Sequence, residues 1–108
     1  MAWGFSNLES LNKYVESSDF VVEQKNVIVL SRPVTINAGA NVTGEFNVAK
    51  AGYKAIGPVG FYRNSNIANL VWNYMHTPTT YRYCLANPTS NAIVVREFRV
   101  FILYVKEH

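Results

Sequence analysis

The sequence contains a single cysteine, Cys84, among its 108 residues. One cysteine cannot form an intrachain disulfide, so the core rather than covalent cross-links must stabilise the fold. Charged residues make up only 16% of the chain, below the usual quarter, whereas hydrophobic residues make up 49%. This balance excludes a disordered chain and supplies more apolar surface than a small monomer needs to bury. We therefore expect a folded protein that self-associates.

Long apolar runs and clusters of basic residues are also missing. No apolar run approaches the roughly 20 residues that span a bilayer. The first ten residues lack the basic start and apolar core of a secretory signal. The ten Lys and Arg residues outnumber the seven Asp and Glu residues, but they are scattered along the chain. We therefore expect a protein that is made in the cytoplasm, does not insert into membranes and does not bind nucleic acid.

The residues that usually carry catalysis or bind metals are few and poorly spaced. His76, Cys84 and His108 do not form a ligand pair at the spacing that zinc sites use. Only Glu45 and Glu97 could act as the two carboxylates of a glycoside hydrolase. We expect instead that Glu97 pairs with a neighbouring arginine and that Glu45 points to solvent. The sequence therefore predicts a protein without enzymatic activity, metal or cofactor.

The first 18 residues have the only helical pattern. Ser6 and Glu9 are spaced as a capping box, and the apolar residues that follow recur at helical intervals. This pattern predicts a short helix over residues 7–16, in an N-terminal segment 1–18 that serves assembly. The residues that we expect at a subunit interface are Trp3, Phe5, Leu8, Leu11 and, from the last strand, Ile102.

Residues 19–108 have the pattern of a β domain. The run from Asp19 to Ile36 is rich in β-branched residues, and Lys25-Asn26 is predicted to form a turn within it. Further strands are predicted over residues 42–49, 53–62, 67–76, 80–86 and 92–105, separated by short polar turns. Because no helical segment lies between them, the strands indicate an all-β fold, an antiparallel β-sandwich of jelly-roll-like type after the N-terminal helix.

The stretch "AGYKAIGPVGFYR" (51–63) has three glycines, as a phosphate-binding loop would. Gly52 and Gly57 have the separation found in a P-loop, but Pro58 and Val59 occupy the positions of the required Lys and Ser/Thr. Glycine and proline inside an apolar run are typical of a bulge or bend. The stretch therefore predicts a bent strand, with the bend at Gly57-Pro58.

Aromatic residues are concentrated in residues 69–83, and two interpretations remain open. These rings either fill a core or subunit interface, or form an exposed surface that binds a sugar with help from amide and guanidinium donors. The residues of this candidate ligand or receptor contact are Asn69, Trp72, Tyr74, Tyr81, Arg82 and Tyr83.

The last strand poses a similar choice, because residues 100–105 are apolar on both faces. One of its faces packs either inside the subunit or against a neighbour.

Several segments of residues 34–106 together resemble a known group of domains. They are "VTINAGANVTGEFNVAKAGYKAIGPVGF", a polar loop, a strand and "NPTSNAIVVREFRVFILYVK". This order is similar to small β-sandwich domains of tail-fibre or minor structural proteins from phages and prophages of gut Firmicutes. The resemblance implies a non-enzymatic virion module that contacts a receptor or serves particle assembly. It also implies a homo-oligomer, a trimer by that analogy, with other virion proteins and a host-surface glycan as partners. The alternative is a carbohydrate-binding module that uses the aromatic residues at 69–83.

Overall fold

The computed structural model describes residues 19–64 and 68–107, and every regular element in these ranges is a β-strand. The strands are β1 (Phe20–Ile28), β2 (Val34–Ile36), β3 (Asn41–Asn47), β4 (Tyr53–Arg63), β5 (Asn69–Thr77), β6 (Thr80–Ala86), β7 (Ile93–Val95) and β8 (Phe98–Lys106). The all-β prediction is thus confirmed for these residues. The helix expected over residues 7–16 lies outside them, as do Trp3, Phe5, Leu8 and Leu11. Within the described ranges, no helix is long and apolar enough to cross a membrane.

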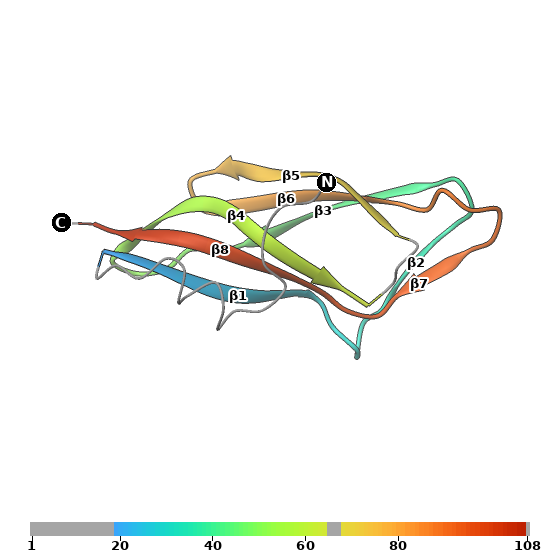
Figure 1. The fold of residues 1–108 in the computed structure, drawn as a ribbon, viewed down its shortest axis with the longest axis horizontal. Helices are drawn as coiled ribbons and strands as arrows, with labels where there is room; N and C mark the ends of the chain where they lie inside the picture. Colours follow the sequence, from blue (N-terminus) through green and yellow to red (C-terminus); the bar gives the residue numbers. More distant parts are fainter. Residues whose placement is uncertain (1–18, 65–67, 108) are drawn as a thin grey trace.

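The strands form three sheets, and every ladder is antiparallel. One sheet has the order β1-β8-β4, another has the order β3-β6-β5, and β2 pairs with β7 in a short two-stranded sheet. Figure 1 shows the two three-stranded sheets running along the length of the molecule, with β2 and β7 at the end far from the C-terminus. Among these ladders, only β5 and β6 are consecutive strands joined by a short turn, which requires them to be antiparallel; the other ladders join strands that are farther apart in the chain.

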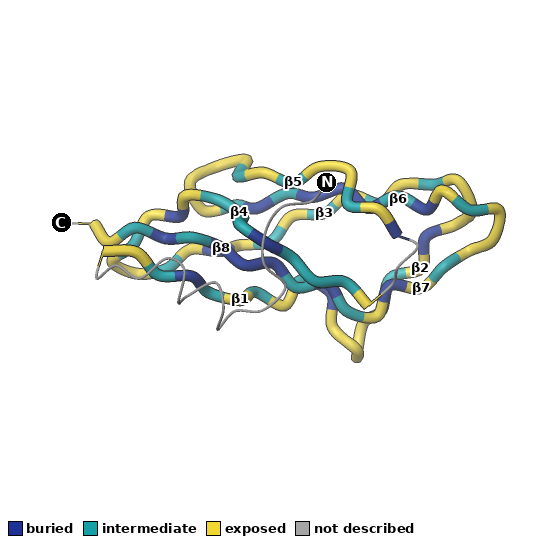
Figure 2. Tube along the Cα trace, in the orientation of Figure 1, coloured by how far each residue is buried: buried dark blue, intermediate teal, exposed yellow. Residues whose placement is uncertain are grey.

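The main core joins residues of both three-stranded sheets. The ring of Tyr83 on β6 lies 5.2 Å from the ring of Phe98 on β8, centroid to centroid. The Tyr104 hydroxyl on β8 donates a hydrogen bond to the carbonyl oxygen of Val48, just beyond β3. Figure 2 shows the buried stretches along β8 and β6. The buried side chains that these two strands contribute are Tyr81, Tyr83, Leu85, Phe98, Val100, Ile102 and Tyr104.

Strand β8 is buried on both of its faces. Ile102 is fully buried in the main core, whereas its neighbour Phe101 is 1% exposed in a second cluster with Val22. Val59 and Leu103 pack against that second cluster. Successive strand side chains point to opposite faces, so the apolar run of β8 supplies two separate clusters. Ile102, expected at a subunit interface, therefore lies inside the subunit.

Strand β4 bends where the sequence predicts it. Its pairing with β8 shifts register between Ala55 and Gly57 and again between Pro58 and Gly60. Gly57 has a φ of 155°, a backbone conformation that residues with a side chain rarely adopt. The interpretation of "AGYKAIGPVGFYR" as a bent strand is confirmed.

The turn predicted at Lys25-Asn26 is wrong. Strand β1 continues through both residues to Ile28, and Lys25 pairs with Val100 of β8. The Lys25 ammonium forms an ion pair with Glu23 at 3.0 Å. The chain instead turns after β1, where the Arg32 N–H donates to the Val29 carbonyl oxygen. Pairing with the long β8 strand overrides the local turn preference of Asn26.

The single strand predicted over residues 92–105 is divided into β7 and β8. Between them, the backbone N–H groups of Arg96 and Glu97 donate to the side-chain Oδ1 of Asn64, at 3.0 and 3.2 Å. Donors used in this way are not available for a strand ladder. The division therefore results from a side chain that lies 32 residues earlier in the sequence.

Candidate functional site

A bulge in β5 decides which of its side chains face outward. Leu70 pairs with Leu85 and Trp72 pairs with Cys84, so Val71 has no partner on β6. From Leu70 to Trp72, β5 advances by two residues while β6 advances by one. The bulge therefore places Leu70 on the core face and Trp72 on the outer face. Regular alternation would place Leu70 on the same face as Trp72, and the bulge separates them. Val71 itself is 53% exposed.

Three rings follow one another along the outer side of β5. The ring centroids of Trp72 and Tyr74 are 5.5 Å apart, with the ring planes inclined by 49°. The centroid of Tyr74 lies 6.2 Å from that of His76, with the rings nearly perpendicular. Trp72 is 37% exposed and Tyr74 is 42% exposed. We call Trp72, Tyr74 and His76 the aromatic row; its rings form an angled rather than a flat surface.

A fixed guanidinium group lies beside the aromatic row. Tyr74 pairs with Arg82 of β6, and Arg82 pairs with Glu45 of β3, so the three side chains cross the sheet in register. Arg82 Nη1 donates to the Tyr74 hydroxyl at 3.3 Å, and Arg82 Nε lies 3.2 Å from Glu45 Oε1 in an ion pair. The guanidinium thus lies between a ring hydroxyl and a carboxylate, and its Nε, although close to Glu45, makes no hydrogen bond to the described residues.

The two tyrosines of β6 lie in the core instead. Tyr81 is fully buried, and its hydroxyl accepts a hydrogen bond from Asn73 Nδ2 at 3.0 Å. Tyr83 is 8% exposed and stacks on Tyr81 with the ring centroids 6.0 Å apart. Burial raises the pKa of both phenols above the ordinary value. The rings of β6 thus fill the core, whereas Trp72 and Tyr74 of β5 are exposed.

Of the six residues expected at a ligand contact, the structure brings three together on the outer face: Trp72, Tyr74 and Arg82. Asn69 is exposed at the start of β5, opposite Ala86. His76 and Glu45 also belong to this surface, although the sequence interpretation had not included them. Because side chains of a strand alternate between its faces, the sequence could have placed His76 on the same face as Trp72. Glu45 could be found only from its pairing with Arg82 on another strand.

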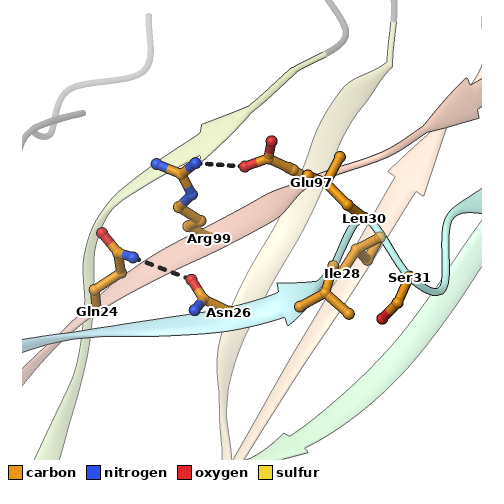
Figure 3. Close-up of a pocket in the computed structure, with 8 residues that line it drawn as sticks. Gln24, Asn26, Ile28, Leu30, Ser31, Glu97 and Arg99 are labelled. Carbon is orange, nitrogen blue, oxygen red and sulfur yellow. Dashed lines mark hydrogen bonds and ion pairs between the residues drawn. The ribbon is translucent and has the colours of Figure 1, made fainter.

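The two carboxylates considered for hydrolysis lie in different surroundings. Glu45 forms the ion pair with Arg82 on the outer face of the β3-β6-β5 sheet, whereas Glu97 forms an ion pair with Arg99 at the start of β8. Figure 3 shows Glu97 and Arg99 beside a depression of about 620 Å³ at the end of β1, where Gln24 Nε2 donates to Asn26 Oδ1. Each carboxylate is paired with its own arginine, so the geometry of a catalytic pair is not formed between them.

The remaining residues considered for metal binding do not assemble. Within residues 19–64 and 68–107, no group of three or more His, Cys, Asp and Glu side chains is placed to hold a metal ion. Cys84 is buried, and His108 lies outside the described residues.

Comparisons with protein-family models, curated proteins and solved structures found no match to this chain.

Proposed function

We propose that the protein is a non-enzymatic binding module whose aromatic row contacts a carbohydrate. The observation that carries this proposal is the exposure of Trp72 and Tyr74 beside the fixed guanidinium of Arg82. Large aromatic side chains are usually buried, and an exposed pair on one face is a common sign of a recognition surface. The apolar face of a sugar ring can stack on such rings while its hydroxyl groups bond to neighbouring donors and acceptors.

The polar neighbours of the row fit a ligand rich in hydroxyl groups. Arg82 supplies N–H donors, Glu45 supplies carboxylate oxygens as acceptors, and the Tyr74 hydroxyl can do both. Arg82 Nε has no hydrogen-bond partner in the described part of the chain, so a ligand hydroxyl can accept a hydrogen bond from it. Glu45 and Glu97 each form an ion pair with a different arginine, which favours binding over hydrolysis.

We further propose that the module belongs to a phage virion, where it would contact a glycan receptor on the host surface. The support is the resemblance of residues 34–106 to domains of phage tail-fibre and minor structural proteins. In this proposal, the β1-β8-β4 and β3-β6-β5 sheets are the two layers of a jelly-roll-like sandwich. The mixed core, with Tyr83 of one sheet against Phe98 of the other, supports that arrangement.

The binding proposal can be tested with soluble polysaccharides extracted from the cell walls of gut Firmicutes. The chain has two tryptophans, so a Trp3→Phe background leaves Trp72 as the only indole reporter. We expect the fluorescence of Trp72 to change on titration with a recognised polysaccharide. Trp72→Ala, measured by calorimetry, should weaken binding about tenfold or more, as loss of a central aromatic contact does.

The matched control is Val71→Ala, which alters the neighbouring exposed residue of β5 and leaves the rings in place. This variant should bind as the parent protein does. If no polysaccharide binds, or if Trp72→Ala and Val71→Ala bind equally well, the aromatic row is not a carbohydrate site. Circular dichroism of each variant shows whether the fold is retained.

A further inference from the structure

Strand β3 is a regular sheet edge. In the order β3-β6-β5, it pairs with β6 alone among the described strands, from Asn41 opposite Ala86 to Asn47 opposite Thr80. This pairing has no register shift, whereas the edge strands β4 and β5 each have two. Bulges protect a sheet edge from pairing with another chain, and β3 lacks this protection.

The backbone groups that β3 leaves at its open edge can be identified. The Val48 N–H donates to the Thr79 carbonyl oxygen, and the Asn87 N–H donates to the Ala40 carbonyl oxygen, both at 2.9 Å. In an antiparallel ladder, the groups that bond to one neighbour alternate along the strand. The even-numbered residues of β3 therefore bond to β6. The odd-numbered residues direct their N–H and C=O groups to the open edge; they are Asn41, Thr43, Glu45 and Asn47.

The side chains of β3 follow the same odd and even pattern as its backbone groups. The four odd-numbered residues are exposed on the outer face of the sheet, whereas Val42 and Phe46 are half-buried and pack against the core. Beside this edge, a cleft of about 570 Å³ has a mixed lining whose apolar part includes Phe46, Tyr83 and Val34. A strand that pairs with β3 would therefore gain backbone hydrogen bonds and also cover apolar surface.

The sequence of β3, "NVTGEFN", is symmetric in chemical character about Gly44. When the strand is reversed about this residue, Asn41 falls on Asn47, Val42 on Phe46 and Thr43 on Glu45. Each polar residue thus falls on another polar residue, and the two apolar residues fall on each other. A strand with this pattern is complementary to its own antiparallel copy.

We propose that two copies of this chain pair through β3, antiparallel about a two-fold axis at Gly44. Asn41 would then exchange two backbone hydrogen bonds with Asn47 of the partner subunit, and Thr43 would do the same with Glu45 of the partner subunit. Val42 would face Phe46 of the partner subunit in a closely spaced pair without hydrogen bonds. This register uses all seven residues of the strand, and any other register uses fewer.

Pairing of this kind joins two three-stranded sheets into one of six strands. The two β5 strands then lie at its outer edges, about 24 Å apart at the usual strand spacing. Both aromatic rows face the same side of the joined sheet, which would allow two contacts with one polymer. The assembly is a dimer, unlike the trimer that the resemblance implies. It does not depend on the aromatic row, which lies on β5; of the proposed carbohydrate contacts, only Glu45 belongs to β3.

Light scattering should give twice the chain mass of 12.2 kDa at micromolar concentration. A matched pair of variants then tests the register. Asn41→Asp combined with Asn47→Asp places like charges opposite each other and should produce monomers. Asn41→Lys combined with Asn47→Asp places opposite charges there and should retain the dimer. An aspartate at position 47 keeps an acceptor for the Ala49 N–H, which bonds to Asn47 Oδ1 in the native protein.

Cross-linking provides a second test. Asn41→Cys combined with Asn47→Cys should form a disulfide-linked dimer on oxidation, because paired Cα atoms lie about 5.5 Å apart in such a ladder. Either single variant should not, because equivalent residues would lie about 20 Å apart. Cys84 is buried and does not compete. A monomeric or trimeric mass, equal masses for the two charge variants, or equal cross-linking of the single and double variants would overturn the proposal.

Discussion

The ring of Tyr83 occupies the space that a side chain at Gly44 would need. A Cβ atom at Gly44 would lie 2.5 Å from the Tyr83 hydroxyl oxygen and within 3 Å of two of its ring carbons. The two residues pair directly across β3 and β6. Glycine at this position is therefore a packing requirement, since it allows a large core ring to lie flat over the neighbouring strand.

We expect Gly44→Ala to lower the free energy of unfolding by about 1–3 kcal/mol, because the added methyl group displaces Tyr83 from a packed core. Urea unfolding followed by circular dichroism measures this change. The control is Lys54→Ala, at an exposed position of β4 away from the β3 edge, which should change stability by less than about 0.5 kcal/mol. Equal stabilities of the two variants at the same protein concentration would show that Tyr83 has room to move.

Strand β8 offers a test of packing on its two faces. Ile102→Ala should lower the free energy of unfolding by about 2–5 kcal/mol, because it opens a cavity in the main core. Phe101→Ala should cost a similar amount, about 3–5 kcal/mol, in the second cluster. Urea unfolding of the two variants gives both values. If Phe101→Ala leaves stability unchanged, the second cluster contributes little and β8 is stabilised from one side.

The buried tyrosines should make the protein sensitive to alkali. Burial raises the pKa of Tyr81, Tyr83 and Tyr104 above the ordinary value of 10.0. The unfolded chain therefore ionises first, so their contribution to stability is complete below pH 10.0 and is lost as the pH rises toward the folded-state pKa values. We expect the urea concentration at the midpoint of unfolding to decrease as the pH is raised from about 9 to about 11.

Tyr81→Phe serves as the comparison for this pH dependence. It removes one ionisable group and should make the decline of stability above about pH 10 less steep than in the parent protein. The variant also loses the hydrogen bond from Asn73, so the slope with pH, not the absolute stability, is the quantity to compare. An unchanged slope would mean that Tyr81 does not contribute to alkaline unfolding.

The bend of β4 should depend on glycine at position 57. Gly57→Ala forces a side chain into a φ of 155° and should destabilise the fold by about 1 kcal/mol or more. Thermal unfolding detects the loss, and Ile56→Ala, at an adjacent half-exposed residue, is the control. A nucleotide such as ATP should not raise the unfolding temperature of the parent protein; protection by ATP would restore the phosphate-loop interpretation.

Much of the fold follows from local patterns in the sequence. Strand alternation groups Tyr81, Tyr83 and Leu85 of β6 on one face, because the period of a strand is two wherever it is regular. The folded structure decided that this face lies in the core. Glycine and proline within residues 51–63 determined the bend of β4, because their backbone restrictions act within a few residues. The apolar run at the end of the chain likewise indicated a strand buried on both faces.

The candidate site depended on the tertiary structure. A bulge at Val71 turns Trp72 outward, and only the pairing of β5 with β6 locates it. The contact of Glu45 with Arg82 requires β3 and β6 to be neighbours in register, and Asn64 ends the pairing of β7 from 32 residues away. These features arise between segments far apart in the chain, so their cause is absent from any local pattern. The sequence alone indicated most of the strands; the folded structure decided where several of them begin and end and where they shift against each other, and with that which rings reach the surface.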